Sequence, residues 1–260
     1  MDTPTVSGER AMPDRPTIAD DLTFADLRGA LADGWRDFAA VPKYGLFFGG
    51  VYVAVGFVIG YLALVGGYTS LLIPATAGFP LIAPFVAVGL YEASRRRELR
   101  EPLSWGNVLG ALKGRGDDQI LSMGVIVFVA FSFWMIVAHA IFAIFMAESG
   151  LGGESLEVFT TSAGIAMLTV GSAVGAVMAF AFYSMTVISL PMLVDRTVSF
   201  PTAIITSFAV IRANLSVMLG WAALITVLLF IALIPAFFGL LVALPVLGHS
   251  TWHLYRRAIS

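Results

Sequence analysis

The chain lacks cysteine and is poor in charge and histidine, with three histidines in 260 residues. Without cysteine it can have no disulfide bond, no thiolate metal ligand and no cysteine nucleophile. Charged residues make up 12% of the chain, about half of their usual share in a soluble domain. The formal net charge of −2 argues against nucleic acid as a partner. The sequence is therefore not that of an ordinary soluble or nucleic-acid-binding protein.

The chain is rich in long apolar runs, and 58% of its residues are hydrophobic. A hydrocarbon layer about 30 Å thick requires roughly 20 apolar residues in a helix that rises about 1.5 Å per residue. The last apolar run is too long for one span, and we divide it near Pro235. The sequence thus predicts an all-α, polytopic membrane protein with six transmembrane helices. The predicted spans are Tyr44–Gly66, Ser70–Tyr91, Ile120–Met146, Ser162–Leu193, Leu215–Ile234 and Ala236–Tyr255.

The basic residues give this map an orientation. All 15 Lys and Arg residues fall on one side of it, before the first span, after the sixth, or between the second and third or the fourth and fifth. The opposite side carries the acidic loop "AESGLGGESLEVFTT", which has no basic residue. By the positive-inside rule, both termini are predicted to be cytoplasmic. A five-span division would place Arg256 and Arg257 outside, so six spans are preferred.

The N-terminal region divides into a tail and an amphipathic helix. Residues 1–22 carry three prolines among acidic and small polar residues, without the apolar core of a secretory signal, so we expect a disordered cytoplasmic tail. A single six-helix transmembrane domain is expected over residues 23–260. Its first helix is predicted to be capped by Thr23 and to lie on the membrane surface or against the spans. The apolar residues at helical spacing are Phe24, Leu27, Leu31, Trp35 and Phe38.

An internal repeat relates the segments that lead into the third and fifth spans. "LSWGNVLGALKGRGDDQILSMG" resembles "VSFPTAIITSFAVIRANLSVML", and Ser104 and Ser199 are matching candidates for helix N-caps. The helix ahead of the first span fits the same pattern more loosely. We therefore predict three parallel repeats, each a cytoplasmic amphipathic helix followed by a transmembrane hairpin. The alternative is that any protein built of hairpins shows such similarity.

Three segments carry a resemblance to a known family. "LADGWRDFAAVPKYGLFFGGVYVAVGFVIGYL", "PLIAPFVAVGLYEASRRRE" and "SFPTAI" resemble the DUF2189 family of bacterial integral membrane proteins. The resemblance runs from about Asp26 to the C-terminus. It implies the fold class and a location in the bacterial inner (cytoplasmic) membrane, as a multi-pass protein. Some members are labelled as cytochrome c oxidases, but that label brings no motif that can be transferred to this chain.

The histidines are the weak candidates for a cofactor or metal site. His139 falls near the outer end of the third predicted span, whereas His249 and His253 fall at the inner end of the sixth. Two imidazoles four residues apart share one helix face, but they cannot supply the opposite axial ligands of one haem. A zinc site would need one or two further ligands. We therefore expect no cofactor and no metal, with His253 at the membrane interface and His249 hydrogen-bonded within the protein.

Glycines mark the predicted helix contacts. Four of them fall within about 60° of one another around the first span, and two more form a G-x-x-x-G motif in the fourth span. Such stripes allow helices to approach closely. Packing inside the six-helix bundle is preferred over an intersubunit contact. The residues are Gly45, Gly49, Gly56 and Gly60 in the first span, and Gly171 and Gly175 in the fourth.

The sequence contains few of the residue patterns that are typical of enzymes. The spans carry no Asp, Glu, Lys or Arg away from their ends, and the sequence shows no phosphate loop or nucleophile elbow. We therefore predict a non-enzymatic accessory or scaffolding subunit of a membrane complex, such as a respiratory one, with the lipid bilayer and another membrane protein as partners. The alternative is a transporter of a small apolar or lipid-like molecule, favoured by the repeats and by Pro74, Pro80 and Pro84. An enzyme or haem protein ranks third.

Overall fold

The computed structural model describes residues 16–65, 87–113, 118–149 and 160–260. Within these ranges the regular structure is helical, apart from an isolated antiparallel bridge between Ile18 and Ile259. A helical segment covers residues 87–98. The other elements are α1 (Phe24–Ala40), α2 (Pro42–Leu64), α4 (Trp105–Gly110), the 3-10 turn η2 (Ala111–Lys113), α5 (Gln119–Ser149), α6 (Ser162–Thr186), α7 (Ser189–Asp195), α8 (Phe200–Ala213), α9 (Leu215–Leu233) and α10 (Leu240–Ala258).

Four stretches of the described residues are long and apolar enough to cross a membrane: Pro42–Leu62, Gln119–Phe145, Ser162–Asp195 and Leu215–Leu233. They correspond to the first, third, fourth and fifth predicted spans. Most of the second predicted span lies outside the described residues. The sixth corresponds to α10, which is not among these four, because its C-terminal half is polar and amphipathic. The all-helical class and the membrane-spanning helices are therefore confirmed at this coarser level.

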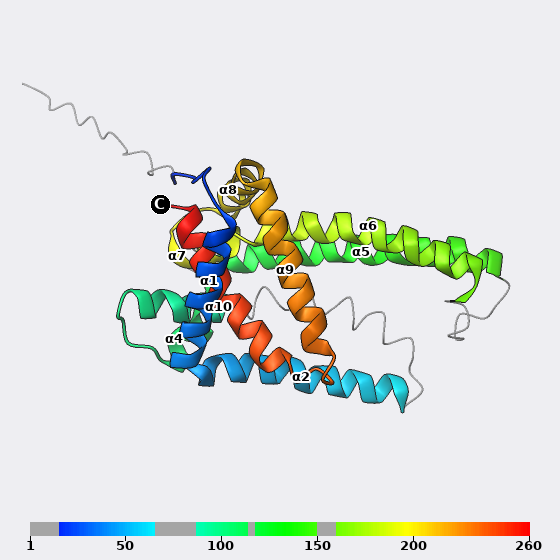
Figure 1. Cartoon of the computed structure of the whole chain (residues 1–260), viewed down its shortest axis with the longest axis horizontal. Coiled ribbons are helices and arrows are strands. Elements are labelled where there is room, and N and C mark those ends of the chain that lie inside the picture. The colour runs from blue at the N-terminus through cyan, green and yellow to red at the C-terminus, as the bar shows by residue number, and fades with distance from the viewer. Residues whose placement is uncertain (1–15, 66–86, 114–117, 150–159) are drawn as a thin grey trace, which may run out of the picture.

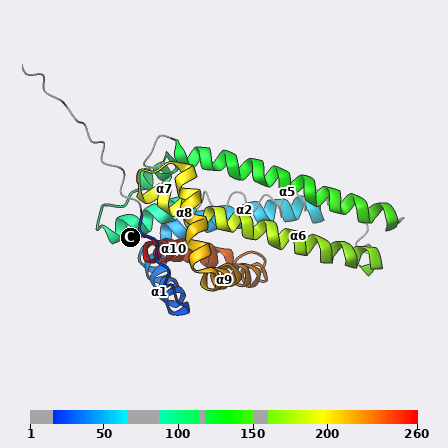
Figure 2. The same ribbon diagram turned by 90° about the horizontal axis from the view of Figure 1, so that it is seen from above.

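The helices radiate from one compact region, which we call the polar cap. It consists of residues 16–22, α1, the segment 87–98, α4, α7, α8 and the C-terminal half of α10. Figures 1 and 2 show α2 and the α5–α6 hairpin leaving this region in the same general direction. Figure 1 also shows α9 running from the cap to the middle of α2, where α10 begins its return. The spanning helices thus share one polar end.

The two ends of the described chain meet in the cap. Thr17 and Ser260 exchange two backbone hydrogen bonds of 3.2 Å, and the Ala19 amide donates to the Ala258 carbonyl. The Asn214 side chain accepts from the Leu22 amide and donates to the Ala19 carbonyl. Residues 16–22, which we expected to belong to a disordered tail, are therefore paired with the C-terminus. Residues 1–15 lie outside the described part.

Helix α1 packs along α10 in the cap. Its start has a capping box, in which Thr23 accepts from the Asp26 amide and the Asp26 carboxylate accepts from the Thr23 amide. The face toward α10 includes Leu27 and Phe38 but also Gly34 and Asp37, all of them buried. Phe24 and Trp35, expected on the same apolar face, are 56% and 53% exposed. Of the two predicted positions for this helix, the structure shows it lying against another helix.

The glycines of the first span differ in what they contact. A Cβ atom on Gly45 would come within 2.6 Å of Pro245 Cβ, and one on Gly49 within 2.9 Å of Leu241 Cα, both in α10. A Cβ on Gly56 would meet the Phe237 ring at an ordinary 3.4 Å, and one on Gly60 would meet nothing within 4 Å. The first two glycines thus allow α2 and α10 to pack backbone to backbone.

Gly49→Leu is expected to lower the melting temperature of the purified protein by several degrees, whereas Gly60→Leu should change it little. A leucine at position 49 must displace the backbone of α10, which costs about 1–3 kcal/mol or more. Thermal unfolding in detergent, followed by far-UV circular dichroism, measures both. Equal tolerance of the two changes would show that α2 and α10 do not pack as described.

The G-x-x-x-G motif of α6 faces α5. A Cβ on Gly175 would lie 3.2 Å from the Trp134 ring, and one on Gly171 would lie 4.0 Å from Ile141. Within the described residues, this motif therefore packs inside one hairpin.

The predicted repeat units share their N-caps but not their lengths. Ser104 accepts from the Asn107 amide at the start of α4, and Ser199 accepts from the Thr202 amide at the start of α8. Helix α8 has 14 residues, as against six in α4. The three parallel repeats accordingly stay a prediction.

Candidate functional site

The three histidines named above fall into two separate settings. His139 is exposed on α5, where its Nδ1 lies 2.8 Å from the Met135 carbonyl of the same helix. His249 and His253 lie one turn apart on α10, and both are directed toward α1 and the segment 87–98. The structure therefore brings the second pair into a polar cluster and leaves His139 outside it.

Asp37 of α1 is the centre of this cluster. Its Oδ2 atom accepts a hydrogen bond of 2.6 Å from Ser94 Oγ and lies 2.8 Å from His253 Nε2. Its Oδ1 atom accepts from Arg97 Nε, also at 2.8 Å. Three elements that are far apart in the sequence are thus tied to one buried carboxylate. We call Asp37, Ser94, Arg97, His249 and His253 the Asp37 cluster.

The proton positions in the cluster follow from the donor count. Because Ser94 has a single hydroxyl proton and donates it to Asp37, its oxygen must accept from His249 Nδ1, 2.7 Å away. His249 therefore carries a proton on Nδ1. Its Nε2 atom is buried and has no hydrogen-bond partner among the described residues. A second proton there would be buried and unpaired, so His249 is neutral.

Electrostatics keep Asp37 ionised. Burial by itself would raise its pKa, but the hydrogen bonds from His253, Ser94 and Arg97 outweigh burial and lower the pKa to about 2. A carboxylate that accepts from several donors, one of them a guanidinium, is stabilised in its charged form. Asp37 is therefore a fixed negative charge at neutral pH, and the surrounding donors are oriented toward it.

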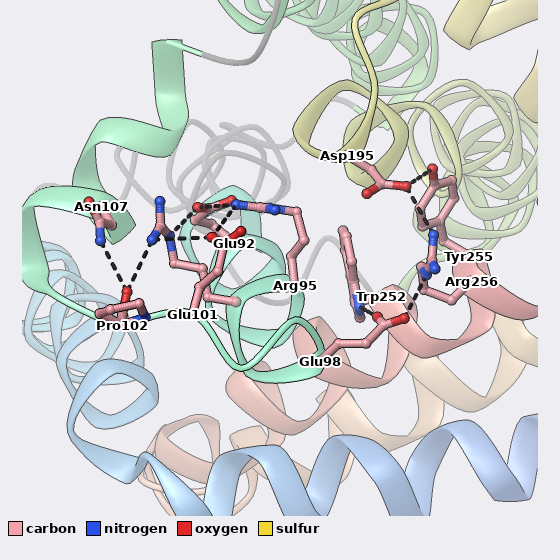
Figure 3. A network of polar contacts seen from close by, with 11 residues as sticks. Glu92, Arg95, Glu98, Glu101, Pro102, Asn107, Asp195, Trp252, Tyr255 and Arg256 are labelled. Atoms are coloured by element: carbon pink, nitrogen blue, oxygen red, sulfur yellow. Dashed lines mark hydrogen bonds and ion pairs between the residues drawn. The ribbon is translucent and has the colours of Figure 1, made fainter.

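A second group of polar contacts joins α10 to the segment 87–98 and to α7 (Figure 3). The Glu98 carboxylate accepts from Trp252 Nε1 and from Arg256 Nε, both at 3.1 Å. Asp195 of α7 accepts from the Tyr255 hydroxyl at 2.8 Å and from Arg256 Nη1 at 3.2 Å. Arg256 thus bridges two carboxylates on different elements. The end of α10 is held from both sides.

The arrangement suits a structural role more than a chemical one. The Ser94 hydroxyl is fully buried and both of its hydrogen-bonding roles are filled, so it is not presented as a nucleophile. Across the described residues, no three His, Asp or Glu side chains form a group that could hold a metal ion. Nε2 of His249 is the one atom in the cluster that is both buried and unpartnered.

Sequence reasoning missed the partners of the histidines. In the sequence, Asp37 is one of several charged residues between the apolar positions of the helix that starts at Phe24, and Ser94 directly precedes three arginines. A weak signal was present, since Asp37 lies one residue before Phe38, a buried position of the helix. The contact between Asp37 and His253 joins residues 216 positions apart, so no local sequence pattern indicates it.

Loss of the His253 hydrogen bond is expected to have a measurable but limited effect. His253→Leu should reduce the free energy of unfolding by about 1–2 kcal/mol, because it leaves Asp37 without one of its donors. His253→Gln should cost less, because a glutamine amide can donate to the same carboxylate. Thermal unfolding of both variants in detergent measures the difference. If leucine were tolerated as well as glutamine, the hydrogen bond to Asp37 would contribute nothing.

Apolar helices of spanning length, joined at one end by a polar cap, define the class of this protein: it is a polytopic, helical integral membrane protein. Residues 72–195 match the model of the family DUF2189, "Predicted integral membrane protein". This match confirms the family resemblance inferred from the sequence. It covers about half of the stretch over which that resemblance was inferred, leaving out residues 26–71 and 196–260. No match was found among curated proteins or solved structures.

Proposed function

We propose that this protein is a six-span, non-enzymatic subunit of the bacterial inner membrane, with the polar cap in the cytoplasm. In this proposal it is an accessory or scaffolding component that binds another membrane protein, such as a subunit of a respiratory complex, through the α5–α6 hairpin.

The observation that supports six spans is that every pair of passes begins and ends in the same cap. The Asp37–Ser94 hydrogen bond joins the helix before α2 to the segment 87–98, so both of these segments lie in the cap. The Phe200 amide donates to the Gln119 side chain at 2.9 Å and joins the start of α5 to the residues after α6 and α7. The hydrogen bonds between Thr17 and Ser260 do the same for the two ends of the chain.

Helix α10 supplies the last return in this topology. It runs antiparallel to α2: Phe237, in the turn before α10, lies beside Gly56, and Pro245 of α10 lies beside Gly45. Residues 234–239, which precede α10, form the outer turn in this proposal. The side-chain hydrogen bonds of α10 to the cap begin at His249, one turn after Pro245. With six passes, all Lys and Arg residues lie on the cap side, as the positive-inside rule requires.

The scaffolding role is supported by how the polar groups and the apolar surfaces are used. Charged side chains of the cap form ion pairs between different helices, such as Arg97 with Asp37 and Arg256 with Glu98, and these pairs hold the helices of the cap together. The α5–α6 hairpin, by contrast, leaves large apolar side chains exposed on both helices, among them Phe133 (59%) and Val177 (71%). A helix pair of this kind can bind the spans of a second protein through shape and small-residue packing.

Site-specific photo-crosslinking tests the proposed partner. A photoreactive residue at Phe133 or at Val177 is expected to give the same discrete protein adduct in intact membranes. Met123, fully buried in α5, is the matched control position and should give none. Adducts to lipid alone at both exposed positions, or to unrelated proteins at each, would contradict a dedicated partner on this hairpin.

The runner-up functions lack an observation of comparable weight. Pro74, Pro80 and Pro84, which favoured a transporter, lie outside the described residues. A metal on His253 Nε2 would replace its hydrogen bond to Asp37, and among the described residues His249 and His253 belong to no group of three side chains that could hold a metal ion. We expect the purified protein to show no Soret band and no stoichiometric zinc, and a haem absorption lost on changing both histidines to glutamine would overturn the scaffold proposal.

A further inference from the structure

The short helices that lead into α5 and α9 each leave apolar side chains exposed on one face. In α4 and η2 these are Trp105, Leu109 and Leu112, and in α8 they are Ile205 and Phe208. Side chains three or four residues apart share one face of a helix that turns about 100° per residue. We call the first group the α4 stripe and the second the α8 stripe.

The other faces of the two helices pack into the cap. Val108 of α4 is buried in a cluster with Tyr44 and Ala93, and α8 buries Val210 and Ile211 in the main core. Each helix thus already has an apolar face that holds it in the fold. The stripes stay exposed within the described structure, and apolar surface left in water costs about 25 cal/mol per Å². Exposed apolar side chains gathered in this way mark an interaction surface.

The α4 stripe adjoins the first turns of the spanning helix α2. The Trp105 ring packs edge-on against the rings of Tyr44 and Phe47, with centroid distances of 4.5 Å and 5.0 Å. Phe47 is itself 47% exposed on a helix that is long and apolar enough to cross the membrane. The apolar surface of this span therefore continues onto α4 at the cap end of the span.

The α8 stripe lies at the same end of the spans. The Phe200 amide at the start of α8 donates to the side chain of Gln119, the first residue of α5. Leu215 and Leu219, in the first turns of α9, are exposed as well, so an apolar surface leads from α8 into that span. Figure 2 shows α8 lying across the direction of the α5–α6 hairpin. A helix in this position runs along the surface of the bilayer.

A basic residue stands beside each stripe. Lys113 directly follows Leu112, and Arg212 lies one turn after Phe208; both basic side chains are exposed. Exposed apolar side chains that include a tryptophan and are flanked by Lys or Arg are typical of segments at the level of the lipid head groups. There the cations meet the negative surface potential of anionic lipids.

We propose that α4 with η2, and α8, are in-plane membrane anchors. Both stripes face the acyl chains in the head-group region on the cap side of the bilayer, and Lys113 and Arg212 face the lipid phosphates. The bilayer is the partner of both stripes, because each one continues the apolar surface of a span that the bilayer already covers. Two anchors that lead into different spans fix the depth of the cap at the membrane surface.

Spin labelling of the purified protein in liposomes tests this placement. Single cysteines replace Leu109 (49% exposed) and Ile205 (68%) and carry nitroxide labels, in vesicles of phosphatidylglycerol and phosphatidylethanolamine. Collisions with oxygen, which is enriched in the bilayer, are compared with collisions with a water-soluble nickel chelate present on both sides. Both labels are expected about 5–10 Å below the lipid phosphates.

Two control positions bracket this depth. Val125→Cys, exposed on the spanning helix α5, should place its label deeper in the bilayer. Gly29→Cys, exposed on α1 where a Cβ meets nothing within 4 Å, should place its label in water. The four variants change exposed positions, and equal melting temperatures in detergent are required before their depths are compared.

Two results would overturn the proposal. Preferred collision with nickel at Leu109→Cys or Ile205→Cys, as at Gly29→Cys, would place that stripe in water. Protection from both oxygen and nickel would show that protein covers the stripe, either a second copy or another part of the chain. No partner protein is present in these liposomes, so the result is independent of the scaffolding role.

Discussion

Gly34→Ala is expected to destabilise the protein by about 3 kcal/mol. Its Cβ would lie 2.1 Å from Ser250 Oγ, and rotation of that hydroxyl gives no relief, because the Ser250 amide nitrogen and Cα would be at 2.6 Å and 2.8 Å. The backbone of α10 would have to move away from α1. That movement would also pull His249, the residue before Ser250, and His253, three residues after it, out of the Asp37 cluster.

The control for this change lies on the same helix. Gly29 is exposed, and a Cβ there meets nothing within 4 Å, so Gly29→Ala should stabilise α1 by about 0.5–1 kcal/mol through helix propensity. Thermal unfolding in detergent should therefore move in opposite directions for the two substitutions. A stable Gly34→Ala variant would mean that α1 and α10 are not packed backbone to backbone.

Asp37→Asn should have the second large effect, a loss of about 2–3 kcal/mol. Asparagine keeps the shape of the side chain but removes the charge that faces Arg97 and His253, and breaking a largely buried ion pair leaves its partners uncompensated. Asp33→Asn on the same helix is the matched control. Asp33 pairs with Arg36, whose side chain is 73% exposed, and surface pairs of this kind contribute at most about 1 kcal/mol.

The acid dependence of stability gives this prediction an independent signature. The pKa of Asp37 is lowered to about 2 from an ordinary value of 3.8, so its stabilising contribution is complete above 3.8 and is lost as the pH falls toward 2. The wild-type protein should therefore lose more stability than Asp37→Asn between pH 4 and pH 2. Parallel acid profiles for the two proteins would show that the Asp37 carboxylate is not held in its charged form by the folded state.

The spanning helices could be predicted from the sequence because their signal is local. The first, third, fourth and fifth predicted spans need only a run of apolar residues long enough for a bilayer, and the structure has helices α2, α5, α6 and α9 at those places. Ends of helices were less predictable. The sixth span was expected from Ala236, but Ala236 and Phe237 have positive φ angles of 48° and 69°, and α10 begins at Leu240. The turn requires a left-handed backbone there, although neither residue type favours it.

The polar cap was predictable in its composition but not in its contacts. The sequence predicted that His249 is hydrogen-bonded within the protein, and the structure places its Nδ1 atom 2.7 Å from Ser94 Oγ. The position of His253 at the membrane interface stays a prediction. The sequence could not name Asp37 or Ser94 as the partners of the two histidines, because these contacts join residues 155 to 216 positions apart. Gly34 was missed for the same reason. A glycine inside an amphipathic helix indicates close packing only once the opposing helix is known.

Thiol labelling is the most direct test of the central claim that six passes begin and end in one cytoplasmic cap. The absence of cysteine allows single reporters at Ala236, exposed in the turn between α9 and α10, and at Arg28, exposed on α1 of the cap. A membrane-impermeant maleimide should label Ala236→Cys in spheroplasts, in which the outer face of the inner membrane is accessible. It should label Arg28→Cys only after the membrane is permeabilised. Labelling of Arg28→Cys in sealed spheroplasts, or protection of Ala236→Cys until permeabilisation, would contradict this topology.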